Sequence, residues 1–328
     1  MNLKNKIIEF VGQVYWREAI LLSPALIISA CLGIYLGQQI LVLLIGAQLS
    51  LGFGASRSHR NRRWWVIITS TIFTALAATI GSLIGFNSPL FYLLLTILCA
   101  SFAYLNWIDN NFWWINMQVV VALLVASYYH QDLNYALLRG GIILLAGSIL
   151  LVTSYIVAKI IPKVSLALPL TPAVDLPNRV RNSYIYTVVI AVNLSLAIAN
   201  YLSLSNSYWA AIAALMICKP DFKQTYLQAI KRFFGAVLGC LSADLIVHVS
   251  HDHNFILVVV LLINTAIVFS FQKANPLIMT FLATNSIVII ISMYKGNPLA
   301  VAEHRVEATF LGGLIGLILT KLLIRTPK

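Results

Sequence analysis

Charged side chains are scarce in this sequence. Asp, Glu, Lys and Arg make up only 10% of its 328 residues, whereas a soluble domain normally carries about 25%. Hydrophobic residues make up 60%, and the mean hydropathy is +0.89. A water-soluble protein of this length cannot bury so much apolar surface. The composition therefore excludes a soluble globular protein and predicts a protein that crosses a membrane several times.

The motifs of enzymes and pumps are also missing. The sequence contains no phosphate-cradling P-loop, no GxSxG nucleophile elbow and no paired catalytic carboxylates. These absences argue against a hydrolase or an ATP-driven pump, so we expect neither an enzyme nor a bound cofactor. Cysteine is rare, and its four occurrences all lie in or at the end of apolar runs, which favours small buried residues over disulfides. They are Cys31, Cys99, Cys218 and Cys240.

A metal site is not expected either. Histidines cluster in the stretch VHVSHDH at residues 247–253, but no cysteine or helix-borne HxxxH accompanies them. The tryptophans at the predicted membrane interfaces indicate an aromatic belt. They are Trp64, Trp65, Trp107, Trp113 and Trp114.

Long apolar runs occur in two groups of six. A helix needs about 20 residues to cross a bilayer, and the runs at 39–54 and 206–218 are the shortest. We expect an all-α membrane protein of about twelve transmembrane helices, arranged as two six-helix halves that are parallel repeats. The predicted spans are 19–36, 39–54, 65–85, 89–107, 113–129, 136–157, 184–202, 206–218, 232–249, 254–271, 275–293 and 306–324.

Four segments follow from this pattern. Residues 1–18 place apolar side chains at helical spacing between cations, which predicts an amphipathic helix on the inner membrane surface. Residues 19–157 form the first half and residues 183–328 the second. Between them, residues 158–182 contain four prolines and are expected to be a cytoplasmic linker.

The positive charges predict the orientation. With both termini in the cytoplasm, only Arg139, Lys295 and Arg305 of the 22 Lys and Arg residues lie outside the inner loops and tails. This asymmetry is what the positive-inside rule demands. The net charge of +12 is then explained by topology and by anionic lipid of the inner leaflet, and nucleic acid is not an expected partner.

A short pattern recurs in the second half. Small residues follow both arginines at positions +3, +4 and +7: Gly235, Ala236 and Gly239 after Arg232, and Ala308, Thr309 and Gly312 after Arg305. The two copies are separated by an odd number of spans, which predicts a 3+3 inverted repeat within the half. Three GxxxG pairs predict close helix packing. These pairs are Gly81 with Gly85, Gly235 with Gly239, and Gly312 with Gly316.

These motifs resemble those of the fusaric acid resistance (FUSC) family, a group that includes aromatic acid exporters and is related to plant aluminium-activated malate transporters. The resemblance covers 183–328 and is carried by YWAA at 208–211, KPD at 219–221, RFFGAVLG at 232–239 and RVEATFLG at 305–312. In the first arginine motif, at 232–239, Ala236 stands where the family usually has threonine. The resemblance implies passage of organic anions, often aromatic carboxylates, through a bacterial inner membrane. It also implies a periplasmic adaptor protein as a partner.

The residues support an anion path independently. Arg139 and Arg305 defy the charge asymmetry and are predicted near helix starts, where the helix dipole favours anions. Arginine binds a carboxylate through two parallel hydrogen bonds. Arg232 is the expected inner counterpart of Arg305. The alternative is that Arg139 and Arg305 extend to the outer headgroups.

Other candidates complete the predicted site. Thr309 belongs to the second arginine motif, and Tyr208 and Trp209 are predicted to stack on an aromatic substrate. Asp244 and His248 share a helix face and could relay protons or form a static pair at the outer interface. Glu307 points to a different face from Arg305, and it either pairs with a neighbouring helix or carries a proton.

Three functions remain open from the sequence. The first is proton-coupled efflux of organic anions. The second is a passive anion channel, which would use the same cations without coupling. The third is a structural or partner-docking membrane protein without transport.

Overall fold

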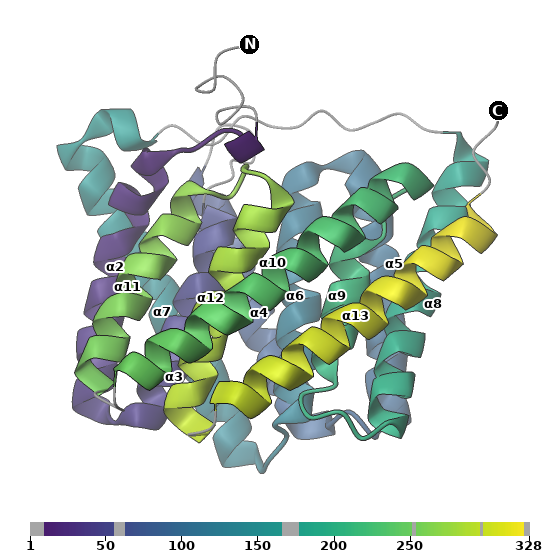
Figure 1. The fold of residues 1–328 in the computed structure, drawn as a ribbon. Coiled ribbons are helices and arrows are strands. Elements are labelled where there is room, and N and C mark those ends of the chain that lie inside the picture. The colour runs from purple at the N-terminus through teal and green to yellow at the C-terminus, as the bar shows by residue number, and fades with distance from the viewer. Residues whose placement is uncertain (1–9, 56–62, 166–176, 251–253, 296–297, 325–328) are drawn as a thin grey trace. The chain divides into compact units, whose positions relative to one another are not determined.

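The computed structural model describes residues 10–55, 63–165, 177–250, 254–295 and 298–324 (Figure 1). Within these ranges the regular structure consists of twelve α-helices and one 3-10 helix, without a strand. The helices are α2 (Trp16–Leu36), α3 (Gln38–Ala55), α4 (Arg63–Ile84), α5 (Pro89–Ile108), α6 (Asn110–Tyr128), α7 (Leu133–Ile160), η1 (Pro162–Ser165), α8 (Asn178–Tyr201), α9 (Tyr208–Ile217), α10 (Phe222–Val249), α11 (Asn254–Ser270), α12 (Pro276–Lys295) and α13 (Pro298–Leu323).

The protein is therefore an all-α membrane protein, as the composition predicts. Each of the twelve predicted spans corresponds to a helix. Ten of these helices are long and apolar enough to cross a membrane, whereas α9 and α11 are shorter apolar helices. The arrangement as two six-helix halves, each an inverted repeat, stays a prediction.

Three helices begin earlier than the hydropathy predicts. α7 begins at Leu133, α10 at Phe222 and α13 at Pro298, so each helix starts several residues before its predicted apolar run. The carboxylate of Asp132 accepts a hydrogen bond from the backbone N–H of Tyr135, and that of Asp221 accepts one from Gln224, each at 3.0 Å. These contacts satisfy backbone donors that the first turn of a helix would otherwise leave without a partner.

The predicted end segments are only partly described. Half of the expected surface helix over residues 1–18, namely 1–9, lies outside the described residues, and the chain is not helical from Gly12 to Tyr15. This segment is hydrogen-bonded to the turn between α11 and α12: the Asn275 N–H donates to the Val11 oxygen, and the Tyr15 N–H donates to the Ser270 oxygen. The middle of the predicted linker, 166–176, also lies outside the described residues.

The described chain forms two compact units. Unit 1 comprises residues 1–56, 145–167 and 231–306, and unit 2 comprises residues 57–144, 168–230 and 307–328. In unit 1, α2 packs against α3 and α11, and these helices lie side by side (Figure 1). In unit 2, α6 packs against α4 and α5, while α8 packs against α5 and α9.

A buried amide joins three helices of unit 1. Gln48 of α3 is 1% exposed. Its Nε2 donates to Ser29 Oγ of α2 and to the carbonyl oxygen of Ala146 of α7, each at 2.8 Å. Because an unpaired amide is costly in an apolar interior, these bonds fix how the three helices pack.

Glycines lie where helices approach most closely. In unit 1, a Cβ at Gly235 would lie 2.5 Å from the Leu277 oxygen of α12, and one at Gly239 would lie 2.6 Å from the Phe281 oxygen. In unit 2, a Cβ at Gly81 of α4 would lie 2.8 Å from the Leu123 oxygen of α6. Gly312 of α13 meets the Ala210 oxygen of α9, and a Cβ at Gly316 would lie 3.2 Å from the sulfur of Cys218.

Gly85 has a different role from the other predicted packing glycines. It follows the last residue of α4 with φ of +69°, a left-handed conformation that glycine adopts without strain. A Cβ here would lie 3.1 Å from the His130 ring. Gly85 therefore ends α4.

Candidate functional site

The structure brings the two motif arginines together in unit 1. Arg232 of α10 and Arg305 of α13 are half-buried, and their like charges are close enough to interact electrostatically. Arg305 also lies within electrostatic range of Cys240, two turns beyond Arg232 on α10. Two cations within electrostatic range of each other raise the local positive potential, which favours an anion near them.

Both arginines lie deeper in their helices than the sequence suggests. At a rise of about 1.5 Å per residue, Arg232 is about 15 Å along α10, and Arg305 is about 11 Å along α13. The effect of the helix dipole falls off within the first turn. The prediction that Arg305 and Arg139 lie near helix starts is therefore wrong, because α13 and α7 begin at Pro298 and Leu133. Any attraction for anions comes from the guanidinium charges themselves.

The glycines of α10 bring α12 close to this arginine pair. A Cβ at Gly235 would lie 2.9 Å from the Cβ of Thr280, and one at Gly239 would lie 2.9 Å from the Cβ of Thr284. Both threonine hydroxyls are buried and have no hydrogen-bond partner among the described residues. Next along α12, Asn285 donates to Ser242 Oγ of α10 at 2.7 Å. Hydrogen-bonding groups thus follow the α10–α12 contact.

The sequence analysis missed Thr280 and Thr284. A threonine in an apolar helix is ordinary, because its hydroxyl can bond a carbonyl one turn earlier in the same helix, as Thr320 Oγ1 bonds the Gly316 oxygen at 2.7 Å. Only the structure shows that Thr280 and Thr284 lack such a bond. Their spacing of four residues, matched to Gly235 and Gly239, was the available signal.

The predicted proton-coupling residues are not brought into contact with one another. Asp244 is half-buried and His248 is exposed. Within the described residues, no ion pair or hydrogen bond joins these two side chains, although they lie one turn apart on α10. Glu307 is exposed, and Thr309 is 7% exposed. Their roles stay predictions.

Arg139 lies in the interior of unit 2 and is only 6% exposed. Its Nη1 donates to Ser82 Oγ at 2.9 Å and to the Ala126 oxygen at 3.0 Å, and its Nη2 donates to the Tyr135 hydroxyl at 3.0 Å. The guanidinium carbon lies 4.8 Å from the centroid of the Tyr135 ring. Arg139 thus joins α4, α6 and α7 and does not extend to a surface. Its role in substrate binding stays a prediction.

Tyr208 and Trp209 belong to an aromatic cluster of unit 2. Their ring centroids are 5.6 Å apart, and the Tyr208 ring lies 5.2 Å from that of Tyr128. The cluster is fixed by Asn206, whose N–H donates to the Tyr128 hydroxyl at 2.9 Å and whose Oδ1 accepts from the Tyr129 hydroxyl at 2.7 Å. Tyr208 and Trp209 are 4% and 2% exposed, so in this conformation both rings are buried.

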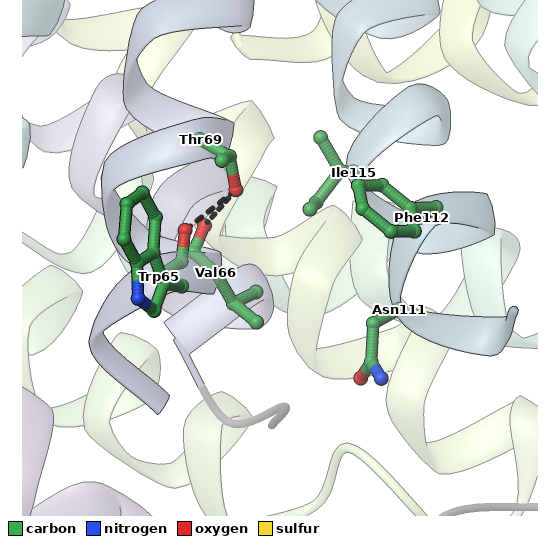
Figure 2. Close-up of a pocket in the computed structure, with 6 residues that line it drawn as sticks. All are labelled: Trp65, Val66, Thr69, Asn111, Phe112 and Ile115. Atoms are coloured by element: carbon green, nitrogen blue, oxygen red, sulfur yellow. Dashed lines mark hydrogen bonds between the residues drawn. The ribbon is translucent and has the colours of Figure 1, made fainter. Parts of the chain in front are cut away.

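A pocket of about 220 Å³ lies elsewhere in unit 2. Figure 2 shows that one wall comes from α4, with Trp65, Val66 and Thr69, and the other from the start of α6. Thr69 Oγ1 donates to the Trp65 oxygen at 2.6 Å, so its hydroxyl is already used. The pocket is lined by apolar and neutral side chains and offers no cation to an anion. It does not coincide with any predicted site residue.

Comparisons with known proteins point to the same part of the chain as the motifs. Residues 194–319 match a family described as fusaric acid resistance protein-like. An uncharacterized protein of Haemophilus influenzae is 25% identical over 126 residues, which cover 38% of this chain and 17% of that protein. The chain therefore aligns with a small part of that relative's length. No solved structure matches the chain.

Proposed function

Because residues 194–319 match the fusaric acid resistance protein-like family, we propose that this membrane protein is a transporter that exports organic anions, with aromatic carboxylates as its substrate class. Its proposed location is a bacterial inner membrane, with both termini in the cytoplasm. The many apolar helices support a transporter. The observation that carries the anion specificity is the proximity of Arg232 and Arg305 in unit 1.

The physical argument starts from the cost of the two charges. A cation at the centre of a membrane costs about 3 kcal/mol or more, so such residues mark ion and substrate pathways. Two guanidinium groups near one another add mutual repulsion, which a bound anion relieves. A carboxylate suits this place because arginine can bind both of its oxygens. The hydroxyls of Thr280 and Thr284 on α12 would add neutral donors beside α10.

The other predicted site residues keep proposed roles, which differ between the two units. In unit 1, Asp244 and His248 are proposed to couple export to protons. In unit 2, Arg139, Tyr208, Trp209 and Thr309 remain proposed substrate contacts, and Glu307 of α13 remains a proposed proton carrier. A periplasmic adaptor protein is the proposed partner that carries the anion onward.

Flux measurements on the purified protein test this function. The full chain is reconstituted into proteoliposomes, and uptake of chloride, malate, benzoate and 4-hydroxybenzoate is followed with and without a pH gradient. We expect flux of the aromatic carboxylates that depends on the gradient. Arg232→Gln and Arg305→Gln should each lower it by about tenfold or more, since each removes a charge-assisted hydrogen bond.

Lys321→Gln is the matched control, because Lys321 is an exposed cation on the same helix as Arg305. Its flux should equal that of the unaltered protein. Current that follows voltage alone would replace the exporter with an anion channel. Full flux in both arginine variants would refute the site, and folded protein that moves none of the four anions would favour the structural role.

A further inference from the structure

The pocket between α4 and α6 lies at one end of a helix contact within unit 2. Toward the other end, Gly81 of α4 lets the backbone of α6 approach, since a Cβ there would lie 2.8 Å from the Leu123 oxygen. At the starts of the two helices the side chains are larger, and they enclose a volume of about 220 Å³. An apolar cavity of about 150 Å³ is enough to hold benzene. This pocket is therefore large enough for one substituted aromatic ring.

The walls of the pocket are apolar and partly aromatic. Trp65 and Val66 of α4 lie opposite Phe112 and Ile115 of α6 (Figure 2). Trp65 is 52% exposed and Phe112 is 39% exposed, whereas Val66 and Ile115 are buried. The pocket therefore joins two accessible rings to buried aliphatic side chains. Such walls suit an aromatic ligand, because its ring can stack at an offset or edge-on against other rings.

One buried amide, that of Asn111, lines the pocket with an unused acceptor. Asn111 is 3% exposed, and its Oδ1 has no hydrogen-bond partner within the part of the chain that the structure describes. The start of α6 fixes its position, because Asp109 Oδ1 accepts from the backbone N–H groups of Asn111 and Phe112 at 2.7 and 3.3 Å. A buried acceptor without a donor is costly, so this oxygen indicates a ligand that donates a hydrogen bond.

Other occupants suit this lining less well. A buried water molecule typically makes about three hydrogen bonds, but the hydroxyl of Thr69, the other polar side chain of the lining, already donates to the Trp65 oxygen at 2.6 Å. A lipid acyl chain fills apolar space but has no donor for Asn111. A carboxylate has only acceptors, which would face the acceptor of Asn111, and no cation lies among the described lining residues.

We propose that this pocket binds a small, neutral aromatic molecule with one hydroxyl group, such as a phenol. The ring packs against Trp65, Phe112 and Ile115, and the hydroxyl donates to Asn111 Oδ1. Both helices are long and apolar enough to cross a membrane, and the pocket lies at their starts, so the ligand reaches it from the membrane interface. A molecule that is apolar at one end and polar at the other favours this region. The site shares no residue with the proposed anion path and does not depend on transport.

Fluorine NMR of the full chain in lipid nanodiscs tests this proposal. The probes are 4-fluorophenol, 4-fluoroanisole, in which a methoxy group replaces the hydroxyl, and 4-fluorobenzoate, which is an anion. Empty nanodiscs measure how much of each probe dissolves in the lipid, and excess phenol should displace the bound 4-fluorophenol. We expect 4-fluorophenol to bind about fivefold more tightly than 4-fluoroanisole, because only the phenol has a donor for Asn111.

Two variants connect the binding to the pocket. Asn111→Leu keeps the size of the side chain and removes the acceptor, so 4-fluorophenol and 4-fluoroanisole should then bind with equal affinity. Trp65→Ala removes one aromatic wall and should weaken binding of 4-fluorophenol by about tenfold. Trp16→Ala is the matched control and should leave binding unchanged, because Trp16 is 58% exposed and belongs to unit 1. Unfolding temperatures without ligand verify that each variant is folded.

The probes and variants together decide the proposal. Saturable binding that prefers the phenol, and that loses this preference in Asn111→Leu, supports it. Equal binding of the phenol and the anisole by the unaltered protein would overturn it in favour of a purely apolar pocket. Tighter binding of 4-fluorobenzoate that Trp65→Ala abolishes, or uptake no greater than that of empty nanodiscs, would also overturn it, whatever the flux measurements show for Arg232 and Arg305.

Discussion

At the scale of single residues, Arg139 shows how a membrane protein can hold a cation in its interior. The hydrogen bonds recorded for its guanidinium go to hydroxyl and carbonyl oxygens of α4, α6 and α7. Each of these acceptors is neutral, so the positive charge is solvated but not cancelled. Arg139 therefore contributes both to the packing of unit 2 and to the potential inside it.

Replacing Arg139 tests the packing role. Arg139→Gln shortens the side chain and leaves Ser82 Oγ and the Ala126 oxygen without their donor, so we expect a loss of about 1–3 kcal/mol in the free energy of unfolding. Thermal unfolding of the purified protein in detergent measures it. The exposed Arg179, replaced in the same way, should leave the unfolding temperature unchanged. If the Arg139 variant unfolded at the same temperature as the control, these hydrogen bonds would make no net contribution to stability.

The sequence motifs identified Arg232 and Arg305, but the predicted position of each arginine along its helix was wrong. It found them through the repeated spacing of arginine, small residues and glycine. Hydropathy then placed each arginine at a helix start, since polar residues precede the apolar run in both cases. The proximity of the two charges could not be predicted, because it depends on the tertiary packing of unit 1, which local spacing does not encode. The absence of a partner for Thr280 and Thr284 could not be predicted for the same reason.

At the scale of helices, the signals for the true starts were in the sequence. Asp221 followed by Gln224 has the spacing of a capping box, Asp132 precedes α7 as an N-cap, and Pro298 occupies the first position of α13. A hydropathy window averages over these positions and so detects the apolar interior of a helix, not its ends. For this reason all twelve helices were predicted, while three starts were wrong by three to ten residues.

The close contact of α10 with α12 gives a prediction for glycine. Gly239→Ala places a Cβ 2.6 Å from the Phe281 oxygen, which is backbone and cannot move aside alone. We expect about 1–3 kcal/mol of destabilisation from this overpacking, measured by thermal unfolding.

Gly46→Ala in α3 provides the matched comparison. A Cβ at Gly46 meets nothing within 4 Å, so alanine should be neutral or stabilise the helix by up to about 1 kcal/mol. Equal unfolding temperatures for the two variants would contradict the close approach at Gly239. Because Gly239 lies two turns beyond Arg232, the same variant should also lower anion flux if the helix is displaced.

At the scale of the whole molecule, composition predicts the class of fold but not its packing. In water, an apolar face marks the side of a helix that must be buried. In a membrane, lipid tails are as apolar as leucine, so a lipid-facing side and a protein-facing side have similar composition. The contacts of α4 with α6 and of α2 with α11 therefore do not follow from hydropathy, whereas the number of helices does.

The orientation of the chain remains to be measured. α8 has 24 residues, and its start and end carry the exposed residues Arg179 and Tyr201. In a Cys31→Ser background, we expect a membrane-impermeant maleimide to label Tyr201→Cys in intact cells. Arg179→Cys should be labelled only after permeabilisation, because the positive-inside rule places it in the cytoplasm.

Cys31 is replaced because it is the exposed member of the cysteines, and the other three are buried. The unaltered background, treated with the same reagent, gives the level of labelling that these buried thiols contribute. The opposite pattern would show that the chain is inverted, and the cations assigned to the inner face would then lie outside.

The helix α9 has a consequence for biosynthesis. It has ten residues, nearly all buried, and so spans about half the hydrocarbon thickness of a bilayer. A segment this short is not retained in the membrane alone as it leaves the ribosome. The backbone N–H and C=O groups at its two ends cannot face lipid tails. The helix therefore needs α6, α8 and α13 around it. Assembly of unit 2 therefore cannot be completed before the last helix has been synthesised, and a chain released early would present α9 to quality-control proteases.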